Sequence, residues 1–202
     1  GYGQSGRSRF RLDSQAVFGE LERDLSARLT ATLGLRYTRE RKVGRYATDV
    51  FGGPDLTAFG PAAAAELRRA QASILRPQSY EARDHDGSLS GRANLAFELA
   101  TGRIAYLAYA HGYKSGGVNM SGLPLDAANR PALATAVIGD ERHRATEAGF
   151  KATGFDGRAT LNLAAYRTVV EDFQANVVSS VETAALRTYP ANVPEVRVQG
   201  VE

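Results

Sequence analysis

The stretch RLTATLGLRYT (28–38) alternates apolar and polar residues along its whole length. A period of two residues is that of a β-strand with one apolar face. SLSGRANLAFEL (88–99) repeats this alternation, and its polar side carries charged residues well inside the strand. In the first stretch the apolar side is formed by Leu29, Ala31, Leu33, Leu35 and Tyr37, and the other side by Thr30, Thr32, Gly34, Arg36 and Thr38.

Five further segments have the character of strands, so the chain is expected to be all-β with about seven antiparallel strands. Several of them are long compared with the ~5–6 residues typical of globular proteins. Strands of this length are common in large membrane barrels, where they outlast the hydrocarbon core of the bilayer. The five segments are 14–22, 103–114, 143–153, 158–177 and 194–202.

The connections between these strands alternate between short and long. Short turns are expected at 22–27, 100–103 and 155–158, and the last of these contains the Asp-Gly pair that favours a tight hairpin. Such alternation is typical of a transmembrane β-barrel, with short periplasmic turns at one end and long extracellular loops at the other. The long loops are predicted at 46–86, 116–141 and 178–192, and PAAAAELRRAQASIL (61–75) in the first has helix-forming composition.

Composition excludes several classes of protein. The 202 residues include no cysteine, which rules out disulfides, thiolate nucleophiles and cysteine-ligated metals. No stretch approaches the ~18–20 apolar residues of a membrane helix. The 25 basic residues are scattered. The densest run, RERKVGR (39–45), is interpreted as a solvated strand end, because no aromatic platform for nucleic acid accompanies it.

No motif for catalysis or cofactor binding stands out. GYKSGG (112–117) lacks the spacing of a phosphate-binding loop, and no Ser-x-x-Lys accompanies its Lys-Ser-Gly triplet. RDHDG (83–87) is interpreted as a polar loop closing into a strand in preference to a metal or base site. Glu171 and Asp172 would point to opposite faces of a strand. We therefore expect no enzyme activity, no cofactor, and no catalytic or metal-binding residues.

Five stretches at the strand ends follow one another along the chain: SQAVFGELERDLSARLTATLGLRYTRERK (14–42), YAHGYKSGG (109–117), TEAGFK (146–151), RATLNLAAYRTVVEDFQ (158–174) and ANVPEVRVQGVE (191–202). Each is similar to a motif in the barrel of TonB-dependent outer-membrane receptors, and the five occur in that family's order. Taken together, they resemble this barrel.

The resemblance implies that residues 1–202 are an interior piece of the barrel domain, in the outer membrane of a Gram-negative cell. The family's plug domain has no counterpart in this sequence, and a barrel of about 22 strands is too large for it. The implied function is active import of a ferric siderophore or similar scarce ligand, such as cobalamin, haem or a glycan. The implied partners are membrane lipid, the ligand and TonB, which would be contacted through parts of the receptor outside this sequence. Nucleic acid is not expected as a partner. A passive porin-like or adhesive barrel and a soluble carbohydrate-binding β-sandwich remain alternatives.

Within this reading, alternation predicts which residues face the lumen, where they would hydrate the wall and contact the plug. The strand at 103–114 would offer Tyr106, Tyr109 and Tyr113 to the aromatic girdles. Lys114 would mark the polar rim, and Gly116-Gly117 would release the chain into a loop. Ligand contacts are expected in loops 46–86 and 116–141. The predicted lumen-facing residues are Thr30, Arg36, Arg92, Asn94, Glu98, Glu147, Lys151 and Asn162.

Overall fold

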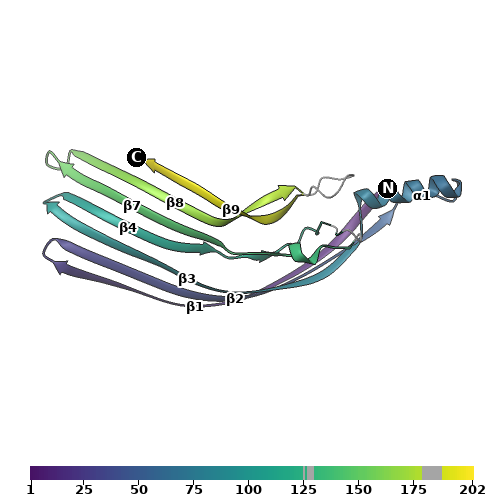
Figure 1. Cartoon of the computed structure of the whole chain (residues 1–202), viewed down its shortest axis with the longest axis horizontal. Helices are drawn as coiled ribbons and strands as arrows, with labels where there is room; N and C mark the ends of the chain where they lie inside the picture. Colours follow the sequence, from purple (N-terminus) through teal and green to yellow (C-terminus); the bar gives the residue numbers. More distant parts are fainter. Residues whose placement is uncertain (125, 127–129, 179–187) are drawn as a thin grey trace.

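The computed structural model describes residues 1–124, 126, 130–178 and 188–202. Seven strands form one antiparallel sheet in which neighbours follow the chain order, with β1 and β9 at its open edges (Figure 1). The sheet is strongly curved along its strands. Its strands are β1 (Tyr2–Ser26), β2 (Leu29–Gly52), β3 (Gln78–Ala100), β4 (Arg103–Lys114), β7 (Glu141–Gly154), β8 (Ala159–Val178) and β9 (Thr188–Val201).

The remaining elements lie in the long connections. Helix α1 (Pro61–Ile74) confirms the predicted helix between β2 and β3, and a proline sits in its first turn, where the missing N–H costs nothing. Between β4 and β7 the chain forms a two-stranded sheet of β5 (Gly117–Val118) and β6 (Val137–Ile138), with the short 3₁₀ helix η1 (Leu133–Thr135) before β6. No helix among the described residues is long and apolar enough to cross a membrane.

The predicted strands are confirmed, but the first long loop was drawn too wide. Residues 46–52 belong to β2 and residues 78–86 to β3, and the two segments remain paired through Arg45 opposite Glu81 and Thr48 opposite Gln78. The expected polar loop at 83–87 is likewise interior to β3. Alternation failed as a signal there because polar residues occupy both faces, while the backbone ladder continues. The predicted loop 178–192 is shorter as well, since β9 begins at Thr188, and residues 179–187 lie outside the described part.

The short turns at 100–103 and 155–158 confirm the hairpin prediction, whereas the turn predicted at 22–27 was placed too early, because β1 continues to Ser26 and β2 begins at Leu29. In FDGR, Asp156 and Gly157 have φ values of 53° and 84°, and Arg158 N donates to Phe155 O over 3.1 Å. Positive φ at both central residues defines the tight turn whose twist matches that of paired strands. The three short turns lie together at one end of the sheet (Figure 1).

One face of the sheet near these turns is apolar and uncovered. From β2 to β9, a single row of cross-strand partners runs Ala31, Leu95, Leu107, Ala148, Ala165 and Val201 without a polar residue. On β1 the same row ends in Arg23. Leu33 is 50%, Leu95 44% and Leu107 50% exposed. A contiguous exposed apolar surface of this kind marks contact with a membrane or partner. We call this surface the apolar band: the odd-numbered residues within 29–37 of β2 and within 89–99 of β3, together with their cross-strand partners on the same face.

Candidate functional site

The face opposite the apolar band is polar. Cross-strand partners on this face include Thr32 with Asn94 and Lys151 with Asn162, while Glu147 lies opposite Tyr166. Because cross-strand partners share a face, register and alternation place all eight predicted residues on this one side. They are Thr30, Arg36, Arg92, Asn94, Glu98, Glu147, Lys151 and Asn162.

The charges on this polar face are largely matched within the sheet. The Arg92 guanidinium donates to Glu20 over 3.0 and 2.6 Å, and Arg36 lies 5.6 Å from the centre of the Phe18 ring. Thr30 donates to Asp24 over 2.7 Å. Three of the predicted residues therefore take part in contacts with β1.

Tyr106 belongs to the polar face, which corrects its predicted place in an aromatic girdle. Its hydroxyl donates to Glu147 over 2.6 Å, and Lys151 Nζ lies 5.3 Å from its ring centre. Tyr106 lies opposite Gly149, where an added Cβ would collide with the tyrosine ring. The strand parity was misjudged: Tyr109 and Tyr113 lie on the apolar side and Tyr106 does not.

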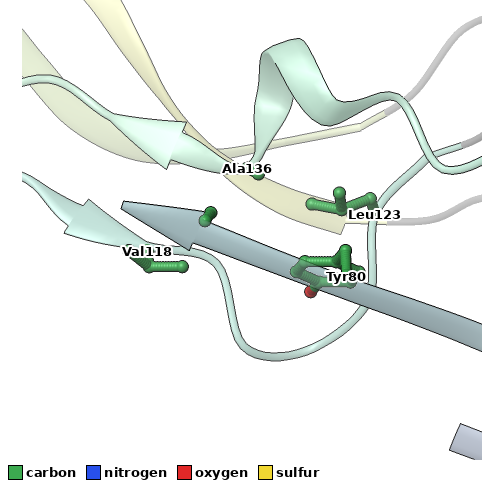
Figure 2. Close-up of a cluster of buried hydrophobic side chains, with 5 residues drawn as sticks. Tyr80, Val118, Leu123 and Ala136 are labelled. Atoms are coloured by element: carbon green, nitrogen blue, oxygen red, sulfur yellow. The ribbon is translucent and has the colours of Figure 1, made fainter. Parts of the chain in front are cut away.

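The described residues of the segment 115–141 fold back over the half of this polar face that lies farther from the short turns, which we call the outer half. Residues 116–141 were predicted as a long loop, but the described residues of the segment carry β5, η1 and β6 and contact β2, β3 and β9 (Figure 1). A small hydrophobic cluster forms beneath it, as Figure 2 shows. The cluster consists of Tyr80 and Ala82 from β3 and Val118, Leu123 and Ala136 from the segment.

Gly44 on β2 allows the segment to approach closely. A Cβ on Gly44 would lie 2.6 Å from Val118 Cγ1 and 2.7 Å from Met120 Sδ, closer than nonbonded atoms approach. A second contact is made by Gln78 of β3. Its side chain donates to Leu123 O and accepts from Leu123 N, both over 2.9 Å. These two bonds hold the segment on β3 much as a further strand would be held.

Tyr80 anchors the same contact through its hydroxyl, which donates to Asn119 O over 2.8 Å. Burial raises the pKa of Tyr80 to about 12. Tyr80 lies in the outer half of β3, beyond the apolar band. Because its pKa is raised, its phenol is neutral across the physiological range.

A buried charge cluster fixes the start of the segment. The Lys42 ammonium lies 3.1 Å from Glu40 Oε2 and 3.2 Å from Asp84 Oδ2, and the Ser115 hydroxyl bridges Lys42 and Glu40. The Lys42 side chain is only 4% exposed. The prediction that 39–45 is a solvated strand end is therefore wrong for Glu40 and Lys42, which face inward beneath the segment.

These groups lie beyond the apolar band, and their ionisation matches their contacts. The Ser115 hydrogen bond, helped by Lys42, holds the pKa of Glu40 below its usual value. Burial alone would lower the pKa of Lys42, but hydrogen bonds and attraction from Glu40 and Asp84 outweigh it and raise that pKa. Glu40 and Lys42 are thus both ionised near neutral pH, as buried charges with partners should be.

The far end of the segment is fixed by amide side chains from β8 and β9. Gln174 donates to Ser115 O over 3.1 Å and to Gly139 O over 2.9 Å, so it ties both ends of the segment together. Asn192 accepts from Gly139 N over 2.9 Å and donates back to Gly139 O over 3.1 Å. Lys114, predicted to mark the rim, reaches Glu141 Oε2 at 3.7 Å and is 57% exposed.

Sequence reasoning missed the polar residues that hold this segment: Glu40, Lys42, Gln78, Tyr80, Asp84, Ser115, Gln174 and Asn192. The alternation of faces along β2 offered a partial signal, because Glu40 and Lys42 lie on the same side of the strand as Arg36. Nothing in the sequence shows that Ser115 reaches Lys42 across 73 positions.

The structure gives no support for a metal site in the described residues, where no group of His, Asp and Glu side chains is placed to hold an ion. The adjacent residues 84–86, which were interpreted as part of a polar loop in preference to a metal or base site, are divided by strand geometry: Asp84 and Asp86 lie on the polar face and His85 on the opposite one.

Comparison with known proteins agrees with this architecture. Solved structures with the same fold include the ferric yersiniabactin uptake receptor FyuA from Yersinia pestis, at 17% identity and a TM-score of 0.67, covering 98% of this chain and 24% of FyuA. The siderophore receptor PiuA from Acinetobacter baumannii has 16% identity and a TM-score of 0.57, over 94% of this chain and 22% of PiuA. The hemophore receptor HasR of Serratia marcescens, solved with its hemophore and heme, has 14% identity and a TM-score of 0.53, over 97% of this chain and 39% of HasR.

The chain therefore spans about a quarter of the length of FyuA and PiuA. No curated protein sequence matches it. A family model described as TonB dependent receptor-like, beta-barrel, matches residues 1–202, the whole chain. With this match, the seven-stranded curved sheet and the alternating turns and loops, the chain belongs to the TonB-dependent receptor β-barrel family.

Proposed function

We propose that this chain forms part of the wall of an outer-membrane receptor that imports a ferric siderophore or haem, with energy delivered through TonB. One observation carries the proposal: the sheet exposes an apolar band on one face and holds the segment 115–141 on the other. A barrel wall in a bilayer has this arrangement, with lipid outside and a polar lumen inside. FyuA and PiuA, which share the fold, are siderophore receptors.

In this proposal the eight predicted residues line the lumen. The pair of Arg92 and Glu20, and Tyr106 with its contacts to Glu147 and Lys151, keep the wall hydrated there. The segment 115–141 narrows the lumen at its outer end, on the path of an entering ligand. The wall carries out no chemical step on the ligand. Contact with TonB is assigned to other parts of the receptor, since the chain corresponds to only 24% of FyuA.

The alternatives are distinguished by specific observations. A soluble β-sandwich buries its apolar face against a second sheet, whereas Leu33 and Leu107 remain half exposed in the described structure. A passive barrel would have the same wall, so only a dependence on energy separates it from an active transporter.

The test is growth under iron limitation. The complete receptor containing this segment would be expressed in a Gram-negative host that lacks its own siderophore and haem receptors. Individual ferric siderophores and haem would then be supplied as the sole iron source, in paired strains with and without TonB. We expect rescue by one ligand class and only with TonB. Rescue in both strains would favour the passive barrel, and absence of rescue by every ligand would refute iron uptake.

A further inference from the structure

In its outer half the sheet divides into two groups of strands, β1–β3 on one side and β4 with β7–β9 on the other. The ladder between β3 and β4 ends where Gly91 faces His111, although β3 itself continues outward to Gln78. On either side of this division the ladders go on, since β2 stays paired with β3 as far as Gln78, and β4 with β7 as far as Lys114. Within the described part of the chain, residues 78–90 of β3 therefore have no strand partner on the β4 side.

The segment 115–141 spans the division between these two groups. Its described residues contact β2 and β3 in one group and β9 in the other (Figure 1). At its start, the Ser115 hydroxyl bridges two charged side chains of β2. Near its end, Gly139 exchanges two hydrogen bonds with the Asn192 side chain of β9. The segment therefore ties together two parts of the wall that no described ladder joins directly at this height.

Among the described residues, the most deeply buried side chains belong to this segment. Leu123 is 0%, Ala136 1% and Asn119 2% exposed. The Asn119 N–H donates to Ala136 O over 2.8 Å, and Asn119 O accepts from the Tyr80 hydroxyl, so one residue links both halves of the segment to β3. Parts of a protein that open readily have few buried apolar contacts and many exposed backbone hydrogen bonds. The segment has the opposite character.

Buried charges fix the points where the segment leaves the sheet and rejoins it. At the start, the Lys42 ammonium lies between two carboxylates, and Ser115 shares in their hydrogen bonds. At the end, the Glu141 side chain, 4% exposed, accepts from Gln174 N over 2.7 Å and lies 2.8 Å from His143 Nε2. Hydrogen bonds to buried charged groups are strong, and removal of a partner leaves the charge uncompensated. These contacts restrict movement at both ends of the segment.

We propose that the segment 115–141 is a fixed brace, which joins the two strand groups and stays seated while a ligand passes, and is not a lid that lifts. The narrowing of the lumen at this height is then permanent, and the ligand passes beside the segment. The passage of a ligand rests on the proposed function, whereas the seating of the segment rests only on the contacts of Ser115, Leu123 and Gly139.

The test measures how fast a cysteine beneath the segment reacts with a membrane-impermeant maleimide added from outside the cell. The chain contains no cysteine, so single cysteines can be introduced into the complete receptor, and the receptor without one gives the background. Ala136→Cys and Ala82→Cys report on the covered surface from the segment and from β3. Leu133→Cys, where the side chain is 59% exposed, is the matched control on the same segment. An open form populated at about 1% would label the covered cysteines about 100-fold more slowly than the exposed one, and we expect at least this protection.

The labelling rates are compared between cells without an added iron source and cells supplied in turn with haem, a ferric hydroxamate siderophore and a ferric catecholate siderophore. We expect the covered cysteines to be equally protected in every state. Adding Gly44→Ala to Ala136→Cys should speed the labelling, because the new Cβ crowds the seat of Val118. That variant shows that the reporter detects an unseated segment.

The opposite outcomes are equally definite. Fast labelling of the covered cysteines in the receptor without an iron source, or a rise in their labelling while an iron source supports growth, would overturn the brace. If no iron source supports growth that depends on TonB, the import function fails. Labelling of the receptor without an iron source still decides the brace in that case, because slow labelling supports the seated segment and fast labelling refutes it.

Discussion

Replacing Leu33 with arginine tests the orientation of the whole sheet. Leu33 is central in the apolar stretch of β2, four residues from both Leu29 and Tyr37. Its cross-strand partners are Leu21 and Ala93, so an arginine there has no carboxylate beside it. The expected result is a strong loss of stability in a membrane.

The magnitude follows from depth. The stretch from Leu29 to Tyr37 spans eight residue steps, about 27 Å along the strand and about 20 Å along the membrane normal. Leu33 therefore lies about 10 Å from either edge of the band, near the midplane. Arginine at that depth costs about 2–4 kcal/mol, which corresponds to roughly a 30- to 1,000-fold change in the folding equilibrium.

The neighbouring substitution Thr32→Arg is the matched control. Thr32 lies on the polar face and donates to Glu22 over 3.3 Å, so an arginine at this position meets a carboxylate. Both variants of the complete receptor would be unfolded with urea from phospholipid vesicles, and their unfolding midpoints compared. A large loss for Leu33→Arg and little change for Thr32→Arg are expected. Equal losses, or a larger loss for Thr32→Arg, would refute the assignment of faces.

Three further predictions concern the polar face. Gly44→Ala should displace the segment 115–141, because the new Cβ meets Val118 at 2.6 Å; faster cleavage of that segment by protease would show it. Gly149→Ala should lower stability by about 1–3 kcal/mol by displacing Tyr106. Gly112→Ala, with open space at the same face, serves as the control for both in thermal unfolding and proteolysis. Since burial raises the pKa of Tyr80 from 10.0 to about 12, the packing of the segment should be intact below pH 10 and weaken as pH rises toward 12, a dependence that Tyr80→Phe should reduce.

The sequence was most informative where one face is apolar. Between Leu29 and Tyr37 apolar and polar residues alternate strictly, and the predicted strand and its division into two faces agree with the structure. Beyond Tyr37 the same ladder continues to Thr48, but polar residues on both faces remove the signal. The predicted loop at 46–86 was therefore too long at both ends, although the helix within it was found.

The candidate site was predictable only in part. Residues such as Arg92 and Asn94 could be assigned to a face because their own strand fixes their direction. The cluster around Lys42 depends instead on the path of the segment 115–141, which brings Ser115 to β2. That path is set by tertiary contacts with Gly44 and Gln78, and no local pattern near Ser115 encodes them. Parity also failed for Tyr106, whose aromatic character suggested an interface but whose position faces Glu147.

The unusual length of the strands gives each face two distinct regions. Strand β2 has 24 residues, whereas about 10 suffice to cross the hydrocarbon core. The inner part carries the apolar band, and the outer part carries Lys42 on one face and Arg41 and Arg45 on the other. The cost of a lipid-facing arginine falls from about 2–4 kcal/mol at the midplane to about 0–1 near the interface. In the proposed barrel wall, the same side of one strand therefore excludes arginine at position 33 and retains it at 41, because depth in the membrane, and not the face alone, decides what each position tolerates.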